Sequence, residues 1–124
     1  MFKRIVFLSA CVAPHTPGTS NVYITGDFNQ DRFQSIILPS ARQLAIPHIS
    51  YVGHEGTAKF MSEKLIMDVA LNRATWIPEP GDFCVCCRSI KRLEEGRIYT
   101  FEEMDPLFEL SIMTVHSLND IEFV

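Results

Sequence analysis

Apolar and β-branched residues occur in short runs separated by proline, glycine and polar residues, a pattern typical of strands joined by turns. The run at 83–90 is the most continuously apolar, so we expect it to be a central strand. The other predicted strands or extended segments are 3–12, 21–25, 33–39, 49–52, 72–78 and 107–115. Together they predict a mixed sheet of about five strands.

Helical periodicity is clearest after Thr57. Apolar residues recur there every three or four positions, at Ala58, Met61, Leu65 and Val69. This spacing predicts an amphipathic helix over 57–68 that packs one face on the sheet.

Two shorter helices are also predicted. Segment 40–46 has room for one or two helical turns before Pro47, and Thr100 with Glu103 forms a capping box for a short helix. We therefore expect an α/β (α+β) fold in which residues 1–124 form a single domain, with two or three helices flanking the sheet.

Loops are predicted at 14–21, 26–31 and 79–82, which are rich in proline, glycine, asparagine and aspartate. Asp27, Asn29 and Asp31 have the spacing that opens a calcium loop. That loop needs glycine at its sixth position and glutamate at its twelfth, where this chain has Arg32 and Leu38. We therefore predict no metal site and no cofactor.

The composition narrows the class of protein. Hydrophobic residues make up 47% of the 124 residues, which argues against a disordered chain, and no apolar run approaches the length of about eighteen residues that spans a membrane. The formal net charge is −4, whereas proteins that coat long nucleic acids are usually basic. We expect a cytoplasmic protein that binds neither membranes nor long nucleic acid.

Leu8 to Cys11 looks like a lipoprotein cleavage box. The apolar stretch before it is too short for a signal peptide, so a buried first strand is the preferred interpretation. Cys84 and Cys86 would share one face of a strand and Cys87 the other, so we interpret them as small core residues and not as metal ligands.

His54 lies where a strand ends and a helix begins, between Gly53 and Gly56. A helix N-terminus offers unpaired N–H groups to an anion, glycines permit close approach, and the Thr57 hydroxyl adds a donor. An imidazole with an ordinary pKa of about 6.5 can donate a proton at cellular pH. The corner therefore has the parts for acid catalysis on a phosphodiester, although a purely structural corner is also consistent with these residues.

A second polar group follows the apolar strand. Arg92 can clamp a phosphate with its planar guanidinium, and Glu95 can orient an imidazole. Arg73 and Arg88, on neighbouring predicted strands, can add positive charge. The same residues are also common on protein surfaces, so they are consistent either with a phosphate site or with an ordinary solvent-exposed surface.

Several motifs occur in a fixed order: GHEGT before the predicted helix, NR at 72–73, EPGD at 79–82, an apolar strand, RLEEGRIYTFEEM at 92–104 and LFEL at 107–110. Over about residues 49–113 this order resembles the DUF1874 family of viral and bacterial proteins. Members of that family include ring-nuclease anti-CRISPRs that act against type III systems.

The resemblance implies a homodimer that binds cyclic tetra-adenylate, or a related cyclic oligonucleotide, across its two-fold axis. It also implies metal-free cleavage, in which a ribose 2′-hydroxyl attacks the adjacent phosphate. Under this resemblance His54 is the general acid, Arg92 stabilises the charge on the phosphorane, and Glu95 assists the histidine. The implied ligand contacts are Gly53, Gly56, Thr57, Arg73 and Arg88.

This chain departs from the family pattern at two points. After the first strand it offers Ser9 and then mostly apolar residues, and Gly56 stands where a hydroxyl residue is often found. The alternative is therefore a non-catalytic protein that sequesters the cyclic nucleotide, or an interaction module on the same fold. If the protein is viral, we expect it in the host-cell cytoplasm.

Overall fold

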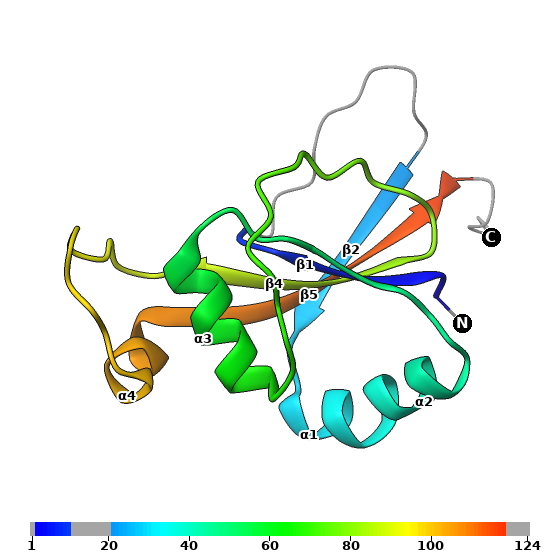
Figure 1. Cartoon of the computed structure of the whole chain (residues 1–124). Coiled ribbons are helices and arrows are strands. Elements are labelled where there is room, and N and C mark those ends of the chain that lie inside the picture. Colours follow the sequence, from blue (N-terminus) through cyan, green and yellow to red (C-terminus); the bar gives the residue numbers. More distant parts are fainter. Residues whose placement is uncertain (1, 11–20, 119–124) are drawn as a thin grey trace.

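The computed structural model describes residues 2–10 and 21–118. Five strands form one sheet with the order β2-β5-β4-β1-β3 (Figure 1). They are β1 (Arg4–Leu8), β2 (Asn21–Asp27), β3 (His48–Tyr51), β4 (Asp82–Ser89) and β5 (Phe108–Ser117). β1 is parallel to both β3 and β4, whereas β5 is antiparallel to β4 and β2. The predicted mixed sheet in a single α+β domain is confirmed.

The helices come from three parts of the chain. The first part is a continuous helical run made of α1 (Gln30–Arg32), a π-helical turn at Phe33–Ile37 and α2 (Leu38–Gln43). α3 spans Glu55–Leu65, and α4 (Phe101–Met104) leads through a 3-10 turn at Asp105–Leu107 into β5. In Figure 1, α3 crosses in front of the sheet and α4 lies at its end. No described helix is long and apolar enough to cross a membrane.

The helices pack on one face of the sheet. Ile5 and Phe7 of β1 belong to a buried cluster with residues of all three helical parts, among them Phe33, Phe60 and Met104. Alternate residues of the strands point to the opposite face, where Val6, Leu8, Cys84, Cys86, Met113 and Val115 form a second buried cluster. The cysteines at 84, 86 and 87 are buried in the core, as predicted.

Two predicted extended segments are wrong. Segment 33–39 is helical: the Asn29 side chain accepts a hydrogen bond from the Arg32 N–H and caps the run, which then buries Phe33 and Leu38. Segment 72–78 forms no strand and has only an isolated bridge before it, between Val52 and Leu71.

The polar groups of segment 72–78 form hydrogen bonds that do not belong to a sheet. The Asn72 N–H donates to the Val52 carbonyl, and its side-chain amide donates to the Ser50 carbonyl. Further along, the Trp76 ring packs on the second core cluster and donates its N–H to Asp82. The segment is therefore a loop held across the end of β3.

The other predicted elements are confirmed with shifted boundaries. α3 begins before Thr57 and ends at Leu65, because Ile66 adopts a left-handed conformation (φ 53°) and the Met67 N–H turns back to the Ser62 carbonyl. The capping box at Thr100 and Glu103 is complete in both directions. The end of the first predicted strand and most of the predicted loop at 14–21 lie outside the described residues.

Candidate functional site

The corner between β3 and α3 holds His54 at the start of the helix. His54 is the N-cap residue, with an extended backbone (φ −120°, ψ 127°), and its carbonyl accepts the first helical bond from the Ala58 N–H, at 3.0 Å. Its imidazole is exposed and makes no capping bond to the helix. The N–H groups of the first turn have no acceptor within the helix and are therefore available to an anion.

A cavity of about 480 Å³ opens at this corner. The α3 side contributes His54, Gly56 and the buried Thr57. The loop after β4 contributes Arg92 and Glu95, together with Leu93. The structure therefore brings together the three side chains predicted to be catalytic, although they come from separate parts of the sequence.

The cavity lies at the carboxyl edge of the parallel strands, where open α/β sheets usually bind ligands. Ser9 lines it just after β1, Ser89 lines it at the end of β4, and Phe108 lines it at the start of β5. These three residues were not among the predicted site residues. The only signal in the sequence was that Ser9 directly follows an apolar strand.

Arg92 and Glu95 are presented on the surface of the loop. Their side chains are 91% and 94% exposed, and the guanidinium and carboxylate are 4.0 Å apart. An exposed pair at this distance contributes little to stability. Both groups are therefore open to a ligand that enters the cavity.

The two other predicted arginines lie apart from this cavity. The Arg73 Nε donates to the Gly53 carbonyl at 3.2 Å, so Arg73 braces the backbone just before His54 without lining the cavity. Arg88 pairs with Glu109 across β4 and β5, and lines a separate cavity with Asp27. Of the other predicted ligand contacts, Gly56 and Thr57 line the cavity with His54, whereas Gly53 and Arg88 do not.

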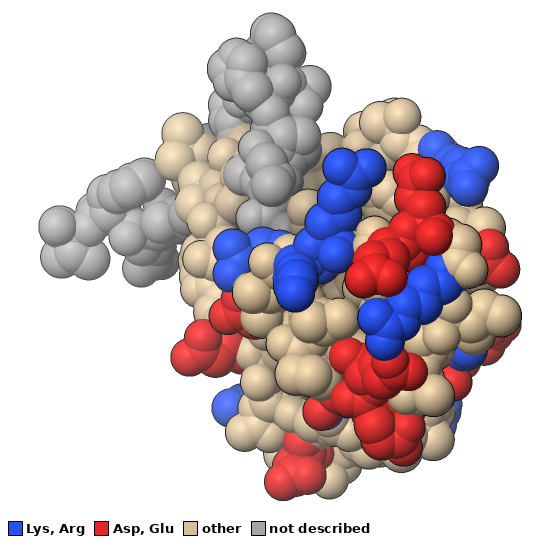
Figure 2. Space-filling view, turned by 90° about the vertical axis from the view of Figure 1, so that its left-hand side faces the viewer, with Lys and Arg blue, Asp and Glu red and all other residues tan. Residues whose placement is uncertain are grey.

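Charges of both signs surround this end of the molecule. Figure 2 looks at the side that carries the α3 corner and shows Lys and Arg side chains next to Asp and Glu side chains, without one extended basic surface. Such a surface suits a compact anion held by a few groups better than a long polyanion. Within residues 2–10 and 21–118, no group of three His, Cys, Asp or Glu side chains is arranged to hold a metal ion.

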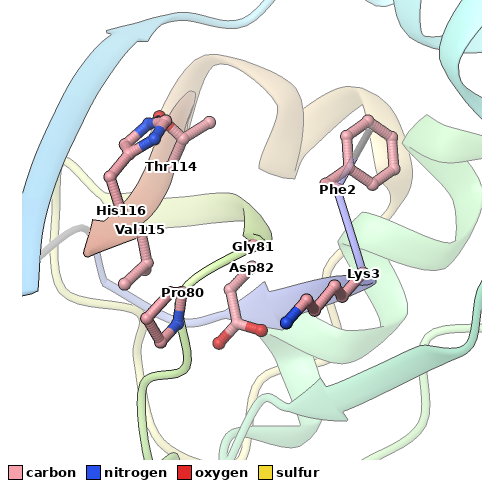
Figure 3. Close-up of a pocket in the computed structure, with 8 residues that line it drawn as sticks. All are labelled: Phe2, Lys3, Pro80, Gly81, Asp82, Thr114, Val115 and His116. Carbon is pink, nitrogen blue, oxygen red and sulfur yellow. The ribbon is translucent and has the colours of Figure 1, made fainter. Parts of the chain in front are cut away.

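A second cavity, of about 340 Å³, lies at the opposite edge of the sheet (Figure 3). Lys3, Asp82 and His116 line it. The Asp82 carboxylate is already occupied: it accepts bonds from the Arg4 guanidinium at 2.5 and 2.9 Å and from the Trp76 ring N–H at 3.1 Å. The hydrogen bond to Asp82 is the main reason that the pKa of Arg4 is raised. This edge therefore has a structural ion pair, and the cavity at His54 is the better candidate for chemistry.

Comparison with known proteins identifies a family. The family model described as STIV B116-like matches residues 14–112. Among solved structures, B116 of Sulfolobus turreted icosahedral virus matches with a TM-score of 0.63 and 16% sequence identity, over 90% of this chain and 98% of that chain. A search of curated proteins finds no match. The structural likeness supports the fold, and the extent of the family match shows that this chain belongs to the STIV B116-like family.

Proposed function

We propose that the protein is a metal-independent ring nuclease of the DUF1874 type, which binds cyclic tetra-adenylate and cleaves it. The observation that carries the proposal is that His54, Arg92 and Glu95 line one cavity beside the N-terminus of α3. This set supplies a proton donor, a bidentate cation and a carboxylate around a place for one phosphate.

In the proposed reaction, the ribose 2′-oxygen attacks the adjacent phosphorus and the bond from phosphorus to the 5′-oxygen breaks. His54, in its protonated form, gives its proton to the departing 5′-oxygen, and the 2′-hydroxyl loses its proton to water. The products carry a 2′,3′-cyclic phosphate and a 5′-hydroxyl, so atoms and charge balance. Because the substrate provides its own nucleophile, the protein needs only to orient the phosphate and stabilise charge.

The other residues support this step. Arg92 stabilises the negative charge of the phosphorane, and the N–H groups of the first turn of α3 add donors on the other side. In the proposal, Glu95 orients the imidazole once Arg92 has turned to the phosphate. Arg73 keeps the backbone before His54 in place through its bond to the Gly53 carbonyl.

The proposal includes a homodimer. A four-fold repeating ring presents equivalent phosphates on opposite sides, and a two-fold axis through the ring would place one His54 near each of two of them. Cleavage at both would release two linear di-adenylates. Removal of this second messenger would shut down type III CRISPR signalling. The viral protein that gives the family its name supports a viral setting. The proposal adds that the protein acts in the host-cell cytoplasm.

The direct test is turnover in EDTA. Purified protein at micromolar concentration, incubated with cyclic tetra-adenylate, should produce linear di-adenylate, and His54→Ala should slow the reaction by about 100-fold or more. His116→Ala is the matched control, because His116 lines the cavity at the opposite edge of the sheet. An unchanged rate in His54→Ala, or no binding of the ring by the wild type, would contradict the proposal.

The second candidate function is sequestration of the ring without cleavage. It is favoured by one observation: Glu95 lies next to Arg92, and both side chains are almost fully exposed. A loop that only grips the ligand needs no more than this arrangement. Tight binding with intact ring after long incubation would support sequestration and exclude the nuclease.

A further inference from the structure

Another cavity, of about 530 Å³, adjoins the one at His54 and is called the adjoining cavity below. The two share Gly56 of α3 and Leu93 of the loop. A Cβ atom on Gly56 would lie 3.4 Å from the Leu93 side chain, so these two segments are in van der Waals contact between the cavities. Only Gly56 and Leu93 therefore separate a phosphate beside His54 from the adjoining cavity.

The walls of the adjoining cavity are largely apolar. Leu93, Ile98, Tyr99 and Met104 contribute to them. Ile98 is 87% exposed, the highest value among the large hydrophobic residues that the structure describes. An apolar side chain at the mouth of a cavity gains most from a ligand that covers it.

Arg97 provides a flat surface in the same cavity. Its guanidinium lies 4.5 Å from the centre of the Tyr99 ring, bonds to Glu103 and is 3.8 Å from Glu94. Glu103 is in turn fixed by the capping box at Thr100. Despite these contacts, 45% of the Arg97 side chain is exposed. The guanidinium is thus oriented before a ligand arrives.

The polar groups at the rim indicate the kind of ligand. Glu55 and Glu94 offer carboxylate oxygens, which accept hydrogen bonds from an amino group, and Lys59 offers a donor to a ring nitrogen of the same ligand. Apolar walls, a fixed guanidinium plane and acceptors at the rim together suit a planar heterocycle with an amino edge. Aromatic bases stack on arginine planes in this way in nucleic-acid complexes.

We propose that this adjoining cavity is a subsite for a purine base, which stacks on Arg97 while the neighbouring phosphate lies beside His54. The proposal rests on the proposed function for its natural ligand, and it adds the part of the protein that selects the base. Adenine would donate its exocyclic amine to the carboxylates at the rim. Uracil, with a smaller ring and a carbonyl at the corresponding edge, would bind less tightly.

The test separates stacking from charge. Arg97→Lys keeps the positive charge but loses the planar surface, and Arg32→Lys is the matched control on an exposed arginine of α1 outside this cavity. Dissociation constants are measured for cyclic tetra-adenylate and cyclic tetra-uridylate. We expect Arg97→Lys to weaken binding of the adenylate ring by about tenfold and to reduce the ratio of the two dissociation constants. Arg32→Lys should leave both dissociation constants unchanged.

Each outcome is decisive. If the wild type binds the adenylate ring and Arg97→Lys binds it equally well with the same base preference, the subsite is wrong and the proposed function stands. If the wild type binds neither ring, the proposed function fails, and adenosine 5′-monophosphate is titrated alone. Chemical-shift changes at Tyr99 and Ile98 in that titration would support the base subsite, and their absence would overturn it.

Discussion

Asp82 shows at the residue scale how one buried charge holds the sheet together. It is 1% exposed, at the start of β4, and accepts bonds from Arg4 of β1, from the Trp76 ring and from the Glu79 backbone N–H at 3.0 Å. The carboxylate thus joins two parallel strands to the loop before β4. A buried charge is tolerated when all its oxygens have partners, as here.

Removal of this carboxylate should destabilise the fold. Asp82→Ala leaves Arg4, whose side chain is only 13% exposed, without its main partner. We expect the free energy of unfolding to fall by about 3–5 kcal/mol, measured by urea denaturation. Glu79→Ala is the matched control, because Glu79 is exposed and 3.9 Å from Arg4, and we expect it to cost less than about 1 kcal/mol. If both variants lose the same free energy of unfolding, the buried pair stabilises the fold no more than the exposed pair does.

Some individual roles could not be predicted from the sequence. Arg88 was expected at the site, but the register of β4 with β5 places it opposite Glu109, which takes up its charge. Ser89 and Phe108 line the candidate cavity because these two residues are paired at the end of the same ladder. Such pairings depend on strand register, and register is not visible in a single sequence before the neighbouring strand is known.

At the scale of elements, α4 depends on its capping box. The Thr100 side chain accepts from the Glu103 N–H, and the Glu103 carboxylate accepts from the Thr100 N–H. The bond from the Thr100 N–H, followed by the bond from Arg97, lowers the pKa of Glu103 below its ordinary value of 4.5. Because the folded state favours the ionised form, the stabilisation is complete above pH 4.5 and is lost as the pH falls through the lowered pKa.

This linkage gives a prediction for α4. Thr100→Ala should reduce the free energy of unfolding by about 1 kcal/mol, because a capping side chain is lost. In the same variant the Glu103 titration midpoint, followed by NMR of the side-chain carboxyl, should rise only slightly, because alanine loses the hydroxyl bond and keeps the backbone N–H bond. Thr75→Ala, on an exposed residue of the loop before β4, is the control. A midpoint that returns fully to 4.5 in Thr100→Ala would mean that the Thr100 side chain, and not its backbone N–H, controls this carboxyl.

Element predictions succeeded where a periodic or capping signal was present. The three- and four-residue spacing after Thr57 predicted α3, and the Thr100 pair predicted α4. The run at Ile36, Ile37 and Leu38 has no period, so a strand and a helix were equally compatible with it, and the cap at Asn29 decided the outcome. Segment 72–78 has strand composition, but Asn72 and Trp76 hold it by hydrogen bonds, and the single bridge beside it lies at Leu71.

At the scale of the whole molecule, the candidate site arises from topology. The parallel strands β1, β3 and β4 point their carboxyl ends to one edge, which brings the α3 corner and the loop after β4 together. The family resemblance carried by the GHEGT and RLEEG motifs implied that His54, Arg92 and Glu95 would share one site, and they line one cavity. The adjoining cavity with Arg97 was not anticipated, because it depends on how the loop folds back onto α3 and α4.

The proposed homodimer gives a prediction at this scale. Sedimentation equilibrium at micromolar concentration should yield twice the chain mass of 14.1 kDa, and addition of cyclic tetra-adenylate should tighten the association. The reason is that a ligand bound across two copies stabilises the dimer and not the separate chains. A single-chain mass both with and without the ring would contradict the two-fold arrangement, and cleavage would then have to proceed on one chain.

The position of β1 inside the sheet, between β4 and β3, also affects how the protein is made. Its two neighbours in the sheet, β3 and β4, begin at His48 and Asp82, far behind it in the order of synthesis. β1 therefore leaves the ribosome long before either neighbouring strand has been made, and the edge that pairs with β4 stays open until that strand has emerged. Fragments that stop short of β4 should aggregate when expressed, and the yield of the full chain should respond to chaperones that shield such edges.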